Sequence, residues 1–185
     1  MRFMKIGTIL VSYTGIRHDL KHKKVKEINR HIRLIEHEND RQLDSQARDL
    51  LASALDATRL SYAPYSDFHV GAAIRLEDGT VLQGCNQENA AFPSGLCAER
   101  VAFFAAGVQH KGKRIEALAI TIRSASKADA EPAAPCGGCL QVMSDVEKRQ
   151  GSPIRIYLQG NSQPVIEAES VSSFLPFGFS LVGKQ

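Results

Sequence analysis

Three cysteines and a glutamate stand at spacings that suit a catalytic metal centre. Cys97 and Glu99 are two residues apart, and Cys136 and Cys139 follow in the sequence PCGGC. Zinc accepts thiolates as tetrahedral ligands, and a catalytic zinc site has three protein ligands and a fourth position for water. Cys97, Cys136 and Cys139 therefore meet the count for one zinc ion, and the carboxylate of Glu99 could move protons at its bound water.

Helical patterning follows both groups of cysteines. Residues 96–108 predict a buried helix because they are apolar nearly all round, and residues 136–148 predict a second helix. The positive end of a helix dipole stabilises thiolates placed at its N-terminus. Three thiolates on Zn²⁺ leave a net charge of −1, and Arg100 is the candidate cation that offsets it.

Two other readings of the Cys-x-x-Cys pair are a structural zinc knuckle and a redox pair. The fourth cysteine, Cys85, lacks a partner at knuckle spacing, so we expect it to be a small buried residue in a strand. A redox pair would leave Cys97 and Glu99 unexplained. The combination of Cys-x-Glu with Pro-Cys-x-x-Cys favours a zinc deaminase, in which the glutamate handles protons without binding metal.

Period-2 and period-3.6 patterns outline the remaining elements. A helix capped by Asp44 or Ser45 is expected to end near Ser61, because Pro64 follows. Strands are expected over residues 68–74, 80–85, 115–122, 154–158 and 165–166, with a weaker edge strand within residues 28–35. Helices that alternate with strands predict an α/β fold, a sheet sandwiched by helices.

Charge separates the chain into a basic N-terminal extension and an acidic body. Residues 1–41 hold ten basic and five acidic side chains, a net charge of +5, and residues 42–185 hold thirteen and fifteen, a net charge of −2. We expect the extension to be partly disordered, its histidines (His18, His22, His31 and His37) to lie at the surface, and residues 42–185 to form the functional domain. The body lacks the basic patch of a nucleic-acid binder, and no apolar run reaches the length of a membrane span.

Several ordered motifs resemble the cytidine deaminases, specifically the small enzymes that carry a Cys-Ala-Glu motif. The resemblance covers about residues 43–179. The matching segments are Tyr62–Ser66 with Phe68, Val70–Ala73, Asn86–Ala91, Cys97–Arg100, Pro135–Cys139 with Gln141, and Leu175–Phe177.

This resemblance implies a cytidine deaminase fold, a three-layer α-β-α sandwich with a mixed five-stranded sheet. It implies hydrolysis of cytidine and deoxycytidine to uridine and deoxyuridine with release of ammonia, as in pyrimidine salvage. Water activated by one zinc ion per chain would attack C4 of the ring, and Glu99 would protonate N3 and then the leaving amino group.

The resemblance also assigns roles around that centre. Asn86 and Glu88 would hold the ribose, Phe68 would pack on the base, and the backbone of Ala98 would contact the pyrimidine. Gln141 would support the metal ligands. Phe177 would either reach towards a neighbouring active site or close its own core.

The small family members are usually homotetramers, so we expect a cytoplasmic homotetramer, with a dimer as the alternative, that binds a nucleoside and neither membrane nor nucleic acid. The sequence departs from the family at Leu140, where the family usually has arginine. This replacement removes a cation near the site or at a subunit contact.

The sequence leaves three alternative functions open: a catalytically silent zinc-stabilised assembly, a polynucleotide deaminase recruited by the basic extension, and a deaminase of nucleoside analogues of the blasticidin type. Intact Glu99, Asn86 and Glu88 disfavour the first, and the acidic body disfavours the second.

Overall fold

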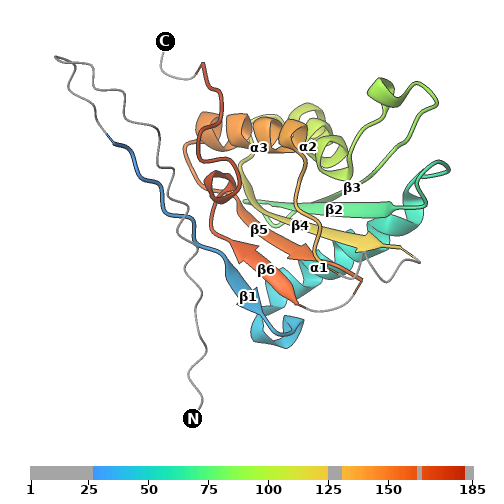
Figure 1. The fold of residues 1–185 in the computed structure, drawn as a ribbon, viewed down its shortest axis with the longest axis horizontal. Coiled ribbons are helices and arrows are strands. Elements are labelled where there is room, and N and C mark those ends of the chain that lie inside the picture. The colour runs from blue at the N-terminus through green and yellow to red at the C-terminus, as the bar shows by residue number, and fades with distance from the viewer. Residues whose placement is uncertain (1–26, 125–130, 162–163, 182–185) are drawn as a thin grey trace, which may run out of the picture.

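A mixed sheet of six strands forms the centre of the molecule, in the order β1-β6-β5-β4-β2-β3 (Figure 1). The computed structural model describes residues 27–124, 131–161 and 164–181. The strands are β1 (Ile35–His37), β2 (His69–Leu76), β3 (Val81–Cys85), β4 (Ile115–Arg123), β5 (Arg155–Gln159) and β6 (Val165–Ala168). The central neighbours β4 and β5 pair in parallel, and the other neighbouring strands pair antiparallel.

Helices cover both faces of this sheet. The helices are α1 (Ser45–Ala57), α2 (Ala98–Gln109) and α3 (Gly137–Gln150), with short 3₁₀ turns η1 (Asp40–Gln42), η2 (Thr58–Leu60), η3 (Phe92–Ser94) and η5 (Val171–Ser173). Helix α1 packs on one face, and α2 and α3 lie together on the other (Figure 1). The predicted three-layer α-β-α arrangement is confirmed.

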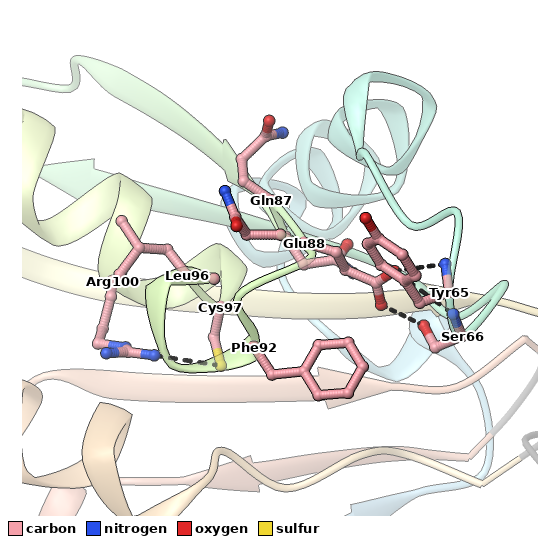
Figure 2. A pocket seen from close by; sticks show the side chains of 11 residues that line it. Tyr65, Ser66, Gln87, Glu88, Phe92, Leu96, Cys97 and Arg100 are labelled. Atoms are coloured by element: carbon pink, nitrogen blue, oxygen red, sulfur yellow. Dashed lines mark hydrogen bonds between the residues drawn. The ribbon is translucent and has the colours of Figure 1, made fainter.

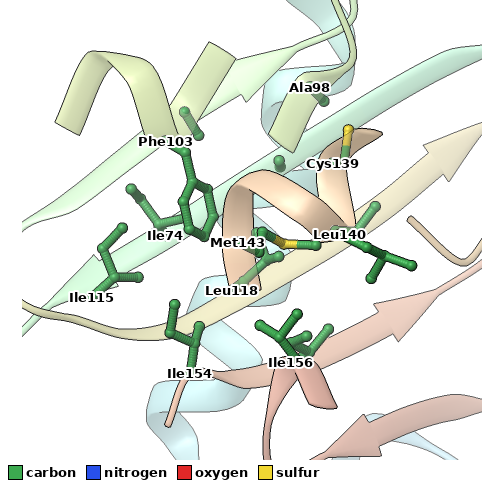
Figure 3. Packing of buried hydrophobic residues seen from close by; sticks show 14 of the residues in the cluster. Ile74, Ala98, Phe103, Ile115, Leu118, Cys139, Leu140, Met143, Ile154 and Ile156 are labelled. Atoms are coloured by element: carbon green, nitrogen blue, oxygen red, sulfur yellow. The ribbon is translucent and has the colours of Figure 1, made fainter. Parts of the chain in front are cut away.

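The main hydrophobic core fills the space between the sheet and the pair α2 and α3. Phe103 of α2 and Met143 of α3 pack with strand residues such as Leu118 and Ile156 (Figure 3). Leu140 belongs to the same cluster and is 9% exposed. Burial of one such aliphatic side chain contributes about 1.5–3 kcal/mol. In this chain, position 140 therefore stabilises the core and does not supply a cation to the thiolates.

Helix α1 begins where its cap predicts. The carboxylate of Asp44 accepts a hydrogen bond from the backbone N–H of Ala47 at 2.7 Å, which satisfies one of the free donors at the helix start. The helix ends at Ala57 and continues as η2 to Leu60, just before the predicted end at Ser61.

Two expectations about the N-terminal region are wrong. The sheet has six strands and not five, because β1 pairs with β6 at the edge of the sheet, a short distance after the edge strand that the sequence suggested. His37 is not a surface residue, since its Nε2 lies 2.8 Å from Oε2 of Glu167 and both side chains are about 15% exposed. His31 is exposed as expected, whereas His18 and His22 lie outside the described residues, as does most of the predicted disordered extension.

In the described part of the chain, no helix has the length and apolar character that crossing a membrane requires.

A glycine sets the distance between β3 and the start of α2. A Cβ atom at Gly84 would lie 2.3 Å from the carbonyl oxygen of Ala98 and 2.6 Å from the backbone nitrogen of Ala102. Both are backbone atoms in the first turns of α2, so the helix would have to move away from the sheet. Because Cys97 directly precedes Ala98, this contact also fixes the position of the first predicted metal ligand.

We therefore expect Gly84→Ala to destabilise the protein by about 1–3 kcal/mol, as overpacking of a close contact does. The free energy of unfolding in urea measures this effect. Gly107→Ala is the matched control, because Gly107 lies in α2, the helix that Gly84 contacts, and a Cβ atom added there would meet nothing within 4 Å. That substitution should leave stability unchanged or raise it by about 1 kcal/mol. Equal stability of the Gly84→Ala variant and the native protein would contradict this account of the β3–α2 contact.

Candidate active site

The N-termini of α2 and α3 meet at three sulfur atoms. Cys97 occupies the N-cap position of α2, Cys136 the N-cap position of α3, and Cys139 the first turn of α3. The sulfur of Cys136 lies 3.8 Å from that of Cys97 and 3.4 Å from that of Cys139, and all three lie within 4.8 Å of one another. Neither N-cap thiol accepts a capping hydrogen bond from a backbone N–H of its own helix.

The distances between these sulfur atoms fit a tetrahedral zinc ion. A Zn–S bond of about 2.3 Å and a tetrahedral angle separate two ligand sulfurs by about 3.8 Å. Zinc is a metal that takes thiolates readily, and three protein ligands leave the fourth position that a catalytic site requires. The group of cysteines that the sequence predicted as ligands is thus brought together at a spacing one ion can occupy.

The electrostatics of the three thiols also favour a cation. Hydrogen bonding from Cys139 and Arg100 lowers the pKa of Cys97 to about 5, against the opposing effect of burial. In turn, the hydrogen bond with Cys97 and its own burial raise the pKa of Cys139. Without a metal, one thiol therefore ionises at the expense of its neighbour, and a divalent ion would allow all three to be thiolates.

Glu99 is buried beside these thiols in the first turn of α2, with 5% of its surface exposed. Burial raises the pKa of this carboxyl group above its usual range, and the charge of Cys97 adds to the effect. Hydrogen bonds with its own backbone N–H and with Cys139 act in the opposite direction. A carboxyl group that holds its proton more tightly than usual is suited to general acid and base chemistry.

Arg100 supplies a cation to the thiols. Its Nη2 lies 3.8 Å from the sulfur of Cys97, and the interaction raises the pKa of the guanidinium group. Its Nε is buried and has no partner among the described residues. Arg100 thus lies close enough to Cys97 to offset part of the negative charge of the thiolates, as predicted.

A cavity of about 520 Å³ opens next to Cys97 and Arg100 (Figure 2). Its lining residues come from the loops before β2 and after β3 and from the start of α2: Tyr65, Ser66, Asn86, Gln87, Glu88, Asn89, Phe92, Gly95, Leu96, Cys97 and Arg100. The predicted sugar ligands Asn86 and Glu88 thus share one cavity with a predicted metal ligand. A volume of this size is within the range of small-molecule sites.

Glu88 is held by the loop that precedes β2. Its Oε2 accepts hydrogen bonds from the backbone N–H of Tyr65 at 2.9 Å and of Ser66 at 3.4 Å, and its Oε1 accepts one from the hydroxyl of Ser66 (Figure 2). These contacts, the Ser66 hydroxyl first, lower the pKa of Glu88 below its usual range. The carboxylate is therefore ionised and oriented in the absence of a ligand.

Asn86 connects the same region to β2. Its Oδ1 accepts the N–H of Val70 and its Nδ2 donates to the carbonyl of Phe68, each at 2.9 Å. A primary amide has two donors and two acceptor sites, so one of each stays available to a ligand. Sequence reasoning missed Tyr65, Ser66, Phe92 and Leu96 as lining residues. Tyr65 and Ser66 lie in the matching segment Tyr62–Ser66, which was given no role at the site, and Phe92 and Leu96 lie between two matching segments.

Four other predicted positions lie outside the cavity lining. Phe68 is half-buried just before β2, and the side chain of Ala98 is fully buried in the core. Gln141 donates from Nε2 to the carbonyl of Phe179 at 3.0 Å, so it fastens the C-terminal segment to α3. Cys85 is half-buried rather than buried, accepts a hydrogen bond from Gln87 at 3.3 Å, and is not part of the sulfur cluster.

Phe177 does not close the core of its own chain. Its side chain is 68% exposed, and its ring lies 5.6 Å from the guanidinium carbon of Arg30. The reading of this residue as a hydrophobic plug is wrong.

Metal content provides a direct measurement on the sulfur cluster. We expect about one zinc ion per chain in the native protein, and less than about a tenth of that in Cys139→Ser, because loss of one of three thiolates weakens the site strongly. Elemental analysis after dialysis against a weak chelator would measure the ratio. Cys85→Ser is the control and should retain its zinc. Retention of zinc by Cys139→Ser would contradict the three-thiolate site.

Comparisons with known proteins agree with this geometry. The family described as cytidine and deoxycytidylate deaminase zinc-binding region matches residues 15–133. The cytidine deaminase of Sporosarcina psychrophila is 43% identical over 132 residues, which cover 71% of this chain and 89% of the relative. The cytidine deaminase of Halalkalibacterium halodurans is 39% identical over 131 residues, 71% of this chain and 92% of the relative.

Solved structures show the same likeness. The crystal structure of a cytidine deaminase from Burkholderia pseudomallei aligns with a TM-score of 0.61 and 35% identity, covering 74% of this chain and all of that one. The cytidine deaminase of Mycobacterium tuberculosis aligns with a TM-score of 0.57 and 33% identity, covering 75% of this chain and all of that one. Since the likeness extends over most of the chain in both sequence and fold, the chain belongs to the cytidine and deoxycytidylate deaminase family.

Proposed function

We propose that this chain is a zinc-dependent cytidine deaminase. It hydrolyses cytidine and deoxycytidine, with water, to uridine and deoxyuridine and releases ammonia. The observation that carries the proposal is that Cys97 belongs both to the cluster of three thiols and to the lining of the cavity that contains Asn86 and Glu88, with buried Glu99 two residues further along the chain. The relatives in Sporosarcina and Halalkalibacterium, both named cytidine deaminase, support the substrate.

Cys97, Cys136 and Cys139 would hold the zinc ion, which lowers the pKa of a water molecule to about 7 and so supplies the nucleophile at neutral pH. Glu99 accepts one proton from the attacking water and delivers it to N3 of the pyrimidine. It then takes the second proton of that water, from the hydroxyl now on C4, and gives it to the amino group, which leaves as ammonia when the C4–N bond breaks. The burial of Glu99 favours the protonated form at the point where a proton has to be carried. Arg100 offsets part of the negative charge of the thiolates.

Substrate binding depends on the other half of the cavity. Asn86 and Glu88 bind the sugar hydroxyls, because a carboxylate and a primary amide with free valences match donors and acceptors on a ribose. Phe68 packs near the base, the backbone of Ala98 contacts the pyrimidine, and Gln141 supports the metal ligands. These three roles are taken from the family, at positions where this sequence has the same residues as the family's motifs.

We also propose that the chain acts as a cytoplasmic homotetramer in pyrimidine salvage, with a dimer as the alternative. Exposed apolar side chains support the assembly: Phe104 is 49% exposed and Val108 is 84% exposed. Both line a groove of about 1060 Å³ between α2 and α3. Exposed Phe177 supports the proposal that the C-terminal segment contacts a neighbouring subunit.

The test is loss of the cytosine absorbance when purified protein is incubated with cytidine, with and without a zinc chelator. We expect conversion to uridine that the chelator abolishes and added zinc restores. Zinc-loaded protein with no turnover of cytidine or deoxycytidine would overturn the proposal and favour an analogue deaminase or a silent assembly. Turnover of single-stranded polynucleotide that depends on residues 1–27 would favour the polynucleotide reading.

Glu99→Gln should lower kcat by at least about 100-fold, because the amide cannot carry the proton. Its zinc content should equal that of the native protein, since Glu99 is not a ligand. Glu36→Gln, an exposed carboxyl group on β1, is the control and should retain activity. Native kcat in Glu99→Gln would remove this residue from the mechanism.

Glu88→Gln should raise KM for cytidine about tenfold to a hundredfold, the range for loss of a hydrogen bond to a charged group. Steady-state kinetics of the zinc-loaded variant measure this change. Glu77→Gln removes a carboxylate that pairs with Arg114 outside the cavity and should leave KM unchanged. An unchanged KM in Glu88→Gln would exclude Glu88 as a sugar ligand.

A further inference from the structure

The loop of residues 62–68 orients Glu88 and is itself held in a strained conformation. Asp67 adopts φ = +53°, in the left-handed region that non-glycine residues occupy at a cost of about 1 kcal/mol or more. Its backbone N–H donates to the carbonyl of Ala63 at 3.0 Å. A strained residue keeps its conformation only when its surroundings hold it there, so the contacts around Asp67 decide whether this corner of the loop persists.

His69, at the start of β2, contacts both sides of the loop. Its Nδ1 lies 2.6 Å from the hydroxyl oxygen of Ser61, immediately before the loop, and its Nε2 lies 3.2 Å from Oδ1 of Asp67, at the strained corner. The imidazole ring is 24% exposed, whereas the carboxylate of Asp67 is 82% exposed. One rigid side chain therefore ties the start of the loop to its corner.

The contacts of Ser61 make this bridge specific for a ring with two polar nitrogens. The hydroxyl of Ser61 also lies 2.7 Å from the carbonyl of Thr58, to which it can donate. When it does so, Nδ1 of His69 has to donate to Ser61, and Nε2 donates to Asp67 only if it carries a proton as well. The protonated ring satisfies both ends in that arrangement, and the neutral ring does so when Ser61 donates to Nδ1 instead. An aliphatic side chain of similar volume satisfies neither end.

The bridge connects directly to the sugar end of the cavity. Between Ser61 and His69 lie the backbone donors of Tyr65 and Ser66 and the hydroxyl of Ser66, all of which bond to Glu88. The Ser66 hydroxyl oxygen also accepts the N–H of Phe68 at 3.1 Å. A shift of the corner at Asp67 would thus change the orientation of Glu88 without any contact between His69 and the substrate.

We propose that His69 is a positioning residue for the binding of the sugar hydroxyls. It holds the loop of residues 62–68, through Ser61 and Asp67, in the conformation that orients Glu88. The proposal rests on the proposed deaminase function, because the sugar contact is made by the residues assigned there.

The test compares His69→Leu with the native enzyme on cytidine and on 2′,3′-dideoxycytidine, which lacks both ring hydroxyls. We expect His69→Leu to raise KM for cytidine about fivefold or more, the size of the loss of a hydrogen bond, with kcat within about twofold. The KM for dideoxycytidine should stay the same, because that substrate has no 2′- or 3′-hydroxyl for Glu88 to bind. His69→Gln, which keeps a donor near the position of Nε2, should recover part of the KM for cytidine.

Hydrogen exchange of the same variants measures the loop independently of activity. Amides of residues 62–68 should exchange faster in His69→Leu than in the native protein, and His69→Gln should lie between the two. His31→Leu is the control, since His31 is an exposed histidine before β1, at the opposite edge of the sheet from β3, and should change neither measurement.

The outcomes separate the two proposals. If the native enzyme does not convert cytidine, the proposed function fails, and the exchange rates alone decide whether His69 holds the loop. If the native enzyme is active but His69→Leu has native KM and native exchange, the positioning role is wrong. An equal rise in KM for cytidine and dideoxycytidine would also overturn it, because the effect would then not pass through the hydroxyl contact.

Discussion

Mutual repulsion among three sulfur atoms is the constraint on which the rest of this site depends. Two helices begin at almost the same point, and each brings a thiol at its N-cap. Three thiolates within 4.8 Å of one another require compensating positive charge. The helix N-termini and Arg100 provide part of it, and the zinc ion that the family holds provides the remainder. Burial, with the negative charge of Cys97 added to it, raises the pKa of Glu99 beside the same thiols.

The layered fold serves to keep those two helix starts together. Helices α2 and α3 share one face of the sheet, so their N-termini can meet only if each lies at a fixed distance from the strands. Gly84 sets that distance for α2, and Leu140 and Met143 anchor α3 in the same core. On the opposite face, a Cβ at Gly71 would lie 1.9 Å from the carbonyl oxygen of Ala54, so α1 also packs tightly against β2. Gly71 in β2 and Gly84 in β3 thus allow helices on both faces of the sheet to approach it closely.

The parts of this structure that could be predicted from the sequence are those encoded locally. The cap at Asp44 indicates where α1 begins, because neighbouring residues determine it. The two short motifs that hold Cys97, Cys136 and Cys139 indicate the metal ligands, because their combination is typical of zinc deaminases although the motifs are far apart in the sequence. The pairing of His37 with Glu167 and the hydrogen bonds from Tyr65 and Ser66 to Glu88 could not be predicted in this way. They join residues distant in the sequence, and only the tertiary fold brings them together. The strand β1 lies later in the chain than its pattern suggested for a related reason, since its position depends on β6, the short strand with which it pairs.

The charges of the cavity lining influence which ligands can enter the cavity. Among its lining residues, the charged side chains are Glu88 and Arg100, and Arg100 faces the sulfur of Cys97. Glu88 is an anion, held in that form by hydrogen bonds from the loop before β2. A phosphate group on a ligand beside Glu88 would meet this carboxylate, and the lining holds no lysine and no second arginine to neutralise it. The charges of the lining therefore disfavour a phosphorylated ligand relative to its unphosphorylated form.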